Sequence, residues 1–334
     1  EEACGPARSL LGAVLRRARE VQRGRETSSA DSLYLLACVL APCAGPDYAA
    51  MVELERATHL ANRGADVELG LKWFDRAIRD SRLVSARELE RVALVDRFWF
   101  VYQRRAWEEA LETGERLWSA SNRQVSGQKE FRALLAWASV LLKFHRVETA
   151  DSVVSVLLGH PELQDEKTVA LLASTVANLA SLLGDYRAGV WRLARLEKGF
   201  SPEFPPALKG RLLLVRLSLL QRLGEPRRIM ALVDSVLACG TSLPDTLVAY
   251  LYVARGNAQF RSGLMEEAIR SYERALGFAG ASLDLAVACA SNWAYALGSI
   301  GRFGEAVDVC SGVYERVKNA GRPDLEADLL TTVG

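Results

Sequence analysis

The stretch Tyr252–Leu276 reads YVARGNAQFRSGLMEEAIRSYERAL, and its pattern recurs along the chain every 38–40 residues. Small side chains mark the recurrence at all but one of the equivalent positions. These marker positions are Gly70, Ala110, Ala150, Gly189, Ile229, Ala268 and Ala306. Self-similarity at a fixed period is typical of a repeat array, in which each unit is too small to bury its own apolar face and stacks on its neighbour. The repeat therefore predicts a stacked array, and it favours a function carried by a surface over one carried by a catalytic pocket.

Each repeat divides into two helices. Residues 246–261 carry apolar side chains at helical spacing, and Ser262-Gly263 then ends this first helix, because glycine tolerates the left-handed conformation that closes a helix. Residues 265–276 form the second helix, with Glu266 and Glu267 in the first turn, where the helix dipole favours carboxylates. The small marker residue is expected where the two antiparallel helices of one pair approach closely near their turn.

The same reading predicts seven helix pairs and one divergent pair before them. The expected pairs are 47–63/66–80, 86–103/106–120, 127–144/147–159, 165–183/186–198, 205–222/226–239, 243–262/265–279 and 283–300/303–319, preceded by 6–23/30–41. An ordinary helical bundle with accidental spacing would not keep the marker positions so close to one period. We therefore expect an all-α, right-handed superhelix (α-solenoid) of about seven to eight antiparallel helix pairs.

Composition and charge exclude several classes of function. Half of the 334 residues are apolar, a quarter are charged and the net charge is +1, so the chain as a whole offers no electrostatic surface for nucleic acid or an anionic membrane. It contains 35 arginines and seven lysines. This bias is explained either by codon usage in a GC-rich genome or by an anion-binding face. We find no signal peptide and no apolar run long enough to span a bilayer.

The cysteines and histidines do not suggest a metal site. The six cysteines have no C-x-x-C spacing, and with three histidines no convincing zinc-ligand set can be assembled. Scattered free thiols suit a reducing compartment, so we expect a cytoplasmic location. His59 has Glu55 four residues earlier, which we interpret as a pair on a helix surface. No G-x-S-x-G, Walker-type loop or H-E-x-x-H sequence is present, so we expect no enzyme activity, no cofactor and no metal.

The repeat resembles the tetratricopeptide repeat (TPR). Tyr252-x-x-Arg255-Gly256-x-x-Gln259 is similar to the W-x-x-L-G-x-x-Y first helix of that family, and Ala268-x-x-x-Tyr272 is similar to its A-x-x-x-F second helix. The resemblance implies three regions: a divergent N-terminal helix pair or cap (1–45), seven TPR-like repeats (46–320) and the start of a further, truncated repeat (321–334). The period, near 39 residues, is longer than the family's usual 34. Such long repeats resemble the sensor arms of bacterial STAND-type and LuxR-type regulators.

The resemblance also implies where a partner binds, because in this family the first helix of each pair lines a concave groove. The positions that carry large aromatic, amide or basic side chains on that side are Trp99, Tyr102, Asn178, Arg222, Tyr250, Asn257, Phe260, Arg261 and Tyr295. Aromatic side chains supply contact area and amides pair with a peptide backbone, so this surface suits a protein or peptide. For Trp99 and Tyr102, which belong to the aromatic run 98–102, packing in the core is the alternative interpretation.

These observations predict a non-catalytic scaffold that binds a protein or peptide through its groove and is part of a larger signalling or regulatory protein. The chain begins without methionine and ends within what resembles another first helix, which favours an excised piece of a longer protein. The alternative is a small-molecule-sensing arm of a STAND/LuxR-type transcriptional regulator, with a small-molecule inducer as its ligand. Under either interpretation we expect no direct nucleic-acid contact and no membrane contact.

Overall fold

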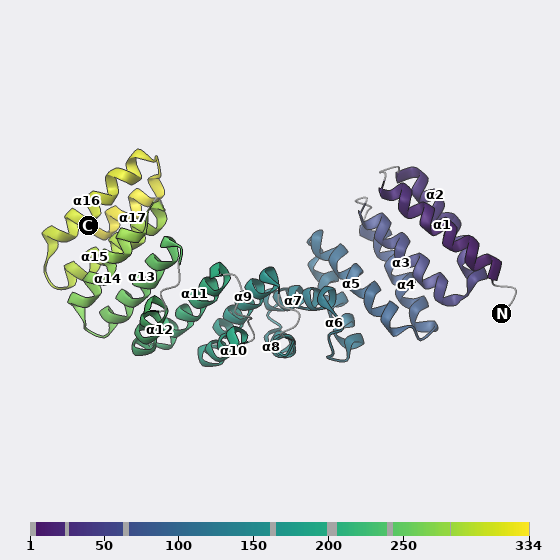
Figure 1. The fold of residues 1–334 in the computed structure, drawn as a ribbon, viewed down its shortest axis with the longest axis horizontal. Helices are drawn as coiled ribbons and strands as arrows, with labels where there is room; N and C mark the ends of the chain where they lie inside the picture. Colours follow the sequence, from purple (N-terminus) through teal and green to yellow (C-terminus); the bar gives the residue numbers. More distant parts are fainter. Residues whose placement is uncertain are drawn as a thin grey trace. The chain divides into compact units, whose positions relative to one another are not determined.

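The computed structural model describes residues 5–23, 27–62, 67–160, 165–198, 206–238, 243–280 and 282–333. The helices of these residues are joined by turns and short loops, and none of the described residues forms a strand. The helices form two compact units, residues 1–163 and residues 164–334. Within each unit, consecutive helices run antiparallel and pack side by side (Figure 1).

Within the residues that the structure describes, the first unit contains four helix pairs. Its helices are α1 (Gly5–Arg23), α2 (Thr27–Ala44), α3 (Pro46–Asn62), α4 (Val67–Leu83), α5 (Arg87–Gln103), α6 (Trp107–Ser121), α7 (Gln128–Lys143) and α8 (Val147–Leu157). The expected helix ends agree with these bounds to within about one turn. The largest change is at α2, which continues through Pro42 to Ala44.

The described part of the second unit contains four further pairs and a final helix. Its helices are α9 (Glu166–Leu183), α10 (Tyr186–Lys198), α11 (Pro206–Leu223), α12 (Pro226–Ala238), α13 (Asp245–Arg261), α14 (Met265–Phe278), α15 (Leu283–Ser299), α16 (Phe303–Asn319) and α17 (Pro323–Val333). The last helix, α17, packs against α15 and α16. The division of the chain at residues 45 and 320 stays a prediction.

The marker positions of the repeat lie between packed helices, as the spacing predicts. Ala110, Ala150 and Ala268 are fully buried. Ala306 is half-buried and packs against the core cluster that contains Ala296 and Leu297 of α15. The periodic small side chain is therefore the point at which each second helix approaches its neighbours, and the all-α fold of stacked pairs is confirmed.

The best-matching repeat, α13 and α14, shows why its sequence requires a glycine. A Cβ atom on Gly256 would lie 2.5 Å from Cε1 of Tyr272, which is too close for two carbon atoms. Glycine at this position of α13 lets the Tyr272 ring of α14 approach the α13 backbone closely. Gly263, in the turn between the two helices, has φ +76°, a conformation that glycine adopts without strain.

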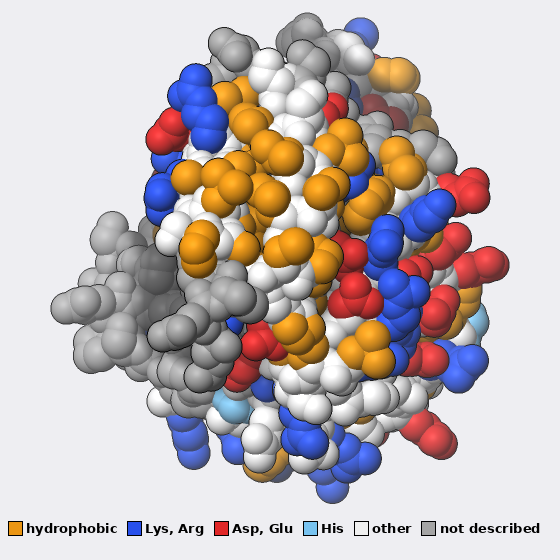
Figure 2. All heavy atoms as spheres, turned by 90° about the vertical axis from the view of Figure 1, so that its right-hand side faces the viewer, with side chains coloured by type: hydrophobic (Ala, Val, Ile, Leu, Met, Phe, Trp, Pro, Cys, Tyr) orange, Lys and Arg blue, Asp and Glu red, His pale blue; other side chains and the backbone are white. Residues whose placement is uncertain are grey.

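The N-terminal pair presents an apolar face. Figure 2 views the molecule from the side on which α1 and α2 lie in Figure 1, and it shows hydrophobic side chains gathered there. Exposed in these two helices are Leu10, Leu35, Leu36 and Val39. The last three recur at helical spacing along α2, on the side turned away from the buried Tyr34 and Ala37. None of the helices in the described part of the chain is both long and apolar enough to cross a bilayer.

Candidate functional site

The nine residues expected to bind a partner all lie on the first helices of their pairs, but they are divided between the two units. Trp99 and Tyr102 lie on α5, in the first unit. The other seven lie on α9, α11, α13 and α15, in the second unit: Asn178, Arg222, Tyr250, Asn257, Phe260, Arg261 and Tyr295. A single groove that passes through all nine therefore stays a prediction.

In the first unit, Trp99 and Tyr102 belong to an aromatic cluster at the end of α5. Their rings meet edge to face with centroids 5.5 Å apart, and Trp107 of α6 meets Tyr102 in the same way at 5.5 Å. The buried Phe98 stacks on Tyr102, and the Lys143 ammonium of α7 lies 4.0 Å from the Trp107 ring centroid. Trp99 and Tyr102 are both half-buried. They therefore pack against the core and keep part of their surface accessible.

In the second unit, Phe260 of α13 and Tyr295 of α15 come together. Their ring centroids are 5.5 Å apart, and Tyr295 is 67% exposed. Phe260 is half-buried and packs against the core cluster that contains Tyr272 and Ala296. Tyr250, also on α13, is exposed. These side chains present accessible aromatic surface on two neighbouring helices, as a binding surface requires.

Asn257 is already engaged inside its own helix pair. Its side-chain oxygen accepts a 2.7 Å hydrogen bond from the Tyr272 hydroxyl of α14. Burial raises the pKa of Tyr272, so that hydroxyl stays protonated and able to donate. Next to it, the buried Ser271 donates to Gln259 at 2.6 Å. Asn257 thus joins α13 to α14, and its part in binding a partner stays a prediction.

The two cations of the expected site contact neighbouring pairs. Arg261 donates to the main-chain oxygen of Gln221 at 2.8 Å, which ties the end of α13 to the end of α11. The Arg222 guanidinium lies 5.9 Å from the ring centroid of Tyr186, at the start of α10. Asn178 is exposed on α9. The structure places Arg222 and Arg261 at the same edge of the second unit, where first helices end.

The interpretation of His59 and Glu55 as a surface pair is wrong. His59 is buried, and its Nε2 lies 2.8 Å from Oδ1 of Asp31 on α2. The Tyr34 ring of α2 lies 4.9 Å from the imidazole, and burial lowers the pKa of His59. Glu55 instead accepts a 3.0 Å hydrogen bond from Arg19 of α1. The physical reason is that the N-terminal pair packs over α3 and covers the face on which His59 lies.

A buried carboxyl in the first unit predicts a pH-dependent stability. Glu53 of α3 is largely buried, and its Oε1 lies 3.0 Å from Nε of Arg76 on α4. Burial, together with the nearby Asp80, raises the pKa of Glu53 from its ordinary 4.5 to about 7, although Arg76 and Arg79 oppose the shift. The folded chain therefore holds this proton more tightly than the unfolded chain. Its contribution to stability should be greatest below pH 4.5 and should fall as the pH rises towards 7.

The measurement is urea unfolding of the parent and of Glu53→Gln across this pH window. Because glutamine cannot ionise, the variant should gain stability relative to the parent as the pH rises from below 4.5 to above 7. The exposed Glu88 of α5, changed to glutamine, is the matched control and should give a curve parallel to the parent's. Parallel curves for Glu53→Gln and the parent would exclude Glu53 as the titrating group.

The described residues give no support for metal or thiol chemistry. Within the ranges that the structure describes, no three or more His, Cys, Asp and Glu side chains are grouped to hold a metal ion. Burial raises the pKa of the Cys289 thiol to about 12, and it also raises the pKa of Cys310 and of Cys38. Thiols in such surroundings stay protonated at neutral pH and are poor nucleophiles.

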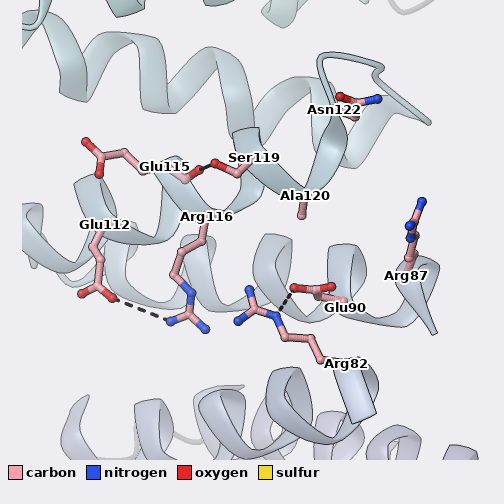
Figure 3. Close-up of a pocket in the computed structure, with 9 residues that line it drawn as sticks. All are labelled: Arg82, Arg87, Glu90, Glu112, Glu115, Arg116, Ser119, Ala120 and Asn122. Atoms are coloured by element: carbon pink, nitrogen blue, oxygen red, sulfur yellow. Dashed lines mark hydrogen bonds and ion pairs between the residues drawn. The ribbon is translucent and has the colours of Figure 1, made fainter. Parts of the chain in front are cut away.

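A pocket of about 690 Å³ in the first unit, between α4, α5 and α6, is lined by charged side chains (Figure 3). Arg82 pairs with Glu90 at 2.5 Å, and Arg116 lies 3.7 Å from Glu112. The Ser119 hydroxyl donates to the main-chain oxygen of Glu115 at 2.9 Å. Two of its three arginines, Arg82 and Arg116, thus face carboxylates, and its hydroxyl donates to the backbone.

An exposed tryptophan was missed because the expected site was confined to first helices. Trp191 lies on α10, a second helix, and is 61% exposed. Val190 and Leu193 of the same helix are buried. The signal was present in the sequence as Arg187-x-x-x-Trp191-x-x-x-Arg195, three residues that recur one turn apart on one helix face.

Comparison with known proteins supports the fold. No protein-family model matches the chain, and no curated protein sequence does either. Among solved structures, the chain is similar to a signal transduction ATPase with numerous domains (STAND) from Pyrococcus horikoshii that has a TPR sensor. The two are 12% identical with a TM-score of 0.50, over 97% of this chain and 49% of that one.

Two further structures are TPR proteins. The C-terminal part of a TPR repeat-containing protein from Cytophaga hutchinsonii is 13% identical with a TM-score of 0.50, over 78% of this chain and 94% of that one. A TPR protein from Parabacteroides merdae is 16% identical with a TM-score of 0.43, over 84% of this chain and 98% of that one. At these identities the likeness concerns the fold. The chain is a TPR-like all-α solenoid.

Proposed function

We propose that this chain is a non-catalytic scaffold that binds a protein or peptide partner along the first-helix faces of its repeats. The observation that carries the proposal is the aromatic surface on α13 and α15, where Tyr295 is 67% exposed and lies against Phe260. Large aromatic side chains held on rigid helices lose little conformational entropy when they bind, and they dominate the energetics of many interfaces. Trp99 and Tyr102 of α5 are the corresponding residues in the first unit.

The test is selection of peptides from a displayed library on the intact chain, followed by titration of a selected peptide. Tyr295→Ala or Trp99→Ala should weaken binding by about 1–3 kcal/mol, because truncation removes a large contact surface. Phe303→Ala is the matched control, since Phe303 is 68% exposed but lies on α16, a second helix. It should bind like the parent.

Thermal unfolding of each variant separates lost binding from lost folding. Peptides whose affinity depends on Phe303 and not on Tyr295 or Trp99 would place recognition on the second helices and overturn the proposal. If all variants bind the selected peptides equally well, both surfaces are excluded as the peptide-binding site.

The second candidate is the sensor arm of a larger regulator, located in the cytoplasm, with a small-molecule inducer as its ligand. It is favoured by the similarity of fold to the P. horikoshii protein, which has a TPR sensor and matches 97% of this chain. A metabolite library screened by thermal shift distinguishes the two candidates. A compound that raises the melting temperature of the parent and loses this effect in Tyr295→Ala would favour the sensor.

A further inference from the structure

A basic pocket lies in the second unit, at the turn between α11 and α12. It has a volume of about 680 Å³ and is lined by Arg187 of α10 together with residues 224–228. The last of these include Arg227 and Arg228, in the first turn of α12. Three guanidinium groups from two second helices thus line one pocket.

The charges around this pocket are unbalanced. Arg228 pairs with Glu225 at 2.5 Å, and Glu225 is the one acid among the described residues that line the pocket. Arg187 and Arg227 are exposed, and neither forms an ion pair with any residue that the structure describes. Asp185, just before α10, accepts a 2.9 Å hydrogen bond from the main-chain nitrogen of Ala188, and with its charge counted the three arginines still outnumber the two nearby acids. A local excess of positive charge therefore stands out in a chain whose net charge is +1.

Trp191 extends the basic pocket along α10. It follows Arg187 by one turn and precedes Arg195 by one turn, so the three side chains share a helix face. All three are exposed, and the Arg195 guanidinium lies 5.7 Å from the Trp191 ring centroid. An indole that is 61% exposed between two arginines offers apolar contact beside positive charge. Tryptophan and arginine are the residues most enriched at the energetic centres of protein interfaces.

We propose that this surface docks an acidic segment of a partner protein. Its members, which we call the α10–α12 patch, are Arg187, Trp191, Arg195, Arg227 and Arg228. Carboxylates of the partner contact the guanidinium groups, whose planar forks match carboxylate geometry. An apolar side chain of the partner packs on Trp191. The patch lies on second helices and is distinct from the first-helix surface proposed above.

A protein partner fits this patch better than nucleic acid does. Binding to nucleic acid draws most of its affinity from many phosphate contacts along an extended basic track. The α10–α12 patch is a compact group centred on one indole, and the charge of Arg228 is partly balanced by its ion pair with Glu225. Along α10, each of the successive pairs Arg187–Trp191 and Trp191–Arg195 is one turn apart, about 5–6 Å between Cβ atoms. This spacing matches that of side chains on an acidic, amphipathic partner segment.

The probe is a fluorescein-labelled synthetic peptide of glutamate, leucine and alanine with leucines at helical spacing. Its binding to the full chain is measured by fluorescence anisotropy at low salt. Two control peptides carry glutamine in place of glutamate, or alanine in place of leucine. We expect the acidic peptide to bind, its affinity to fall as salt rises, and both control peptides to bind more weakly.

The double variant Arg187→Gln/Arg227→Gln should weaken binding of the acidic peptide roughly fivefold or more, since two exposed charge contacts are lost. Trp191→Ala should weaken it roughly tenfold, and should also abolish the preference for leucine over alanine in the peptide. The matched control is Arg270→Gln/Lys318→Gln, which removes the same charge from exposed sites on α14 and α16. It should bind like the parent, and so should Tyr295→Ala.

Each other result overturns the proposal. If the acidic peptide does not bind, or the glutamine peptide binds equally well, carboxylate recognition is excluded. If both double variants weaken binding equally, the attraction is general charge and not this patch. If a single-stranded DNA oligonucleotide binds more tightly than the peptide and depends on Arg187 and Arg227, the partner is nucleic acid. Loss of peptide binding in Tyr295→Ala alone would assign the peptide to the first-helix surface.

Discussion

Replacing Glu130 with alanine should cost about 3–5 kcal/mol of stability, because it removes one partner of a buried ion pair. Glu130 lies in the first turn of α7 and is 4% exposed. Its Oε2 accepts from Arg91 of α5 at 2.5 Å, and from the main-chain nitrogen and hydroxyl of Ser126 at 3.1 and 2.8 Å. Without the carboxylate, the largely buried Arg91 guanidinium loses its counter-charge and the Ser126 nitrogen loses its acceptor.

Chemical denaturation of the full chain, followed by far-UV circular dichroism, measures this cost. Glu148→Ala is the matched control, since Glu148 occupies the first turn of α8 but is exposed. Its loss should cost at most about 1 kcal/mol, from the helix dipole alone. The stability lost in Glu130→Gln should lie between the losses of Glu130→Ala and Glu148→Ala, because an amide keeps the shape of the carboxylate but not its charge. Equal losses for Glu130→Ala and Glu148→Ala would show that the Arg91 contact contributes nothing to the fold.

The helices could be predicted from the sequence because local features repeat. Turn glycines such as Gly263 mark several pairs, and a small residue such as Ala268 marks the close approach in all of the expected repeats except the one with Ile229. The boundary between the two units, at residues 163 and 164, could not be predicted. Across it the marker positions Ala150 and Gly189 keep the same spacing as elsewhere, so the period carries no signal of a break.

The candidate site was only partly accessible to sequence analysis. Periodicity places Tyr295 and Phe260 on neighbouring first helices, and the structure brings their rings together. Periodicity does not say which element covers a given helix face, and so the burial of His59 was missed. The helix that packs over His59 is α2. Because α2 is apolar on most sides, its sequence pattern does not define a single buried face. The exposed Trp191 was missed because the family resemblance implies partner binding on the first helices, and Trp191 lies on a second helix.

Replacing Trp137 with alanine should destabilise the chain by about 3–5 kcal/mol, the usual cost of removing a large aromatic side chain from a packed core. Trp137 of α7 is fully buried, and its Nε1 donates to the main-chain oxygen of Leu111 on α6 at 3.1 Å. Its ring lies against Gly114 of α6, where any added Cβ would overlap the indole. The same substitution at the exposed Trp191 should change stability by less than about 0.5 kcal/mol.

The contact between Gly114 and Trp137 can be isolated by a double-mutant cycle, measured by urea unfolding of the full chain. In the parent, Gly114→Ala should cost about 1–3 kcal/mol, because the new methyl group displaces the indole from its place in the core. In the Trp137→Ala background the same methyl group has room, and it fills part of the cavity that the indole leaves. Gly114→Ala should therefore be neutral or stabilising there, since alanine is also the better helix former.

Additive costs in the cycle would show that the two helices separate to absorb the change. A strong positive coupling would show that α6 and α7 are held at a fixed distance, because only a rigid approach makes glycine obligatory opposite tryptophan.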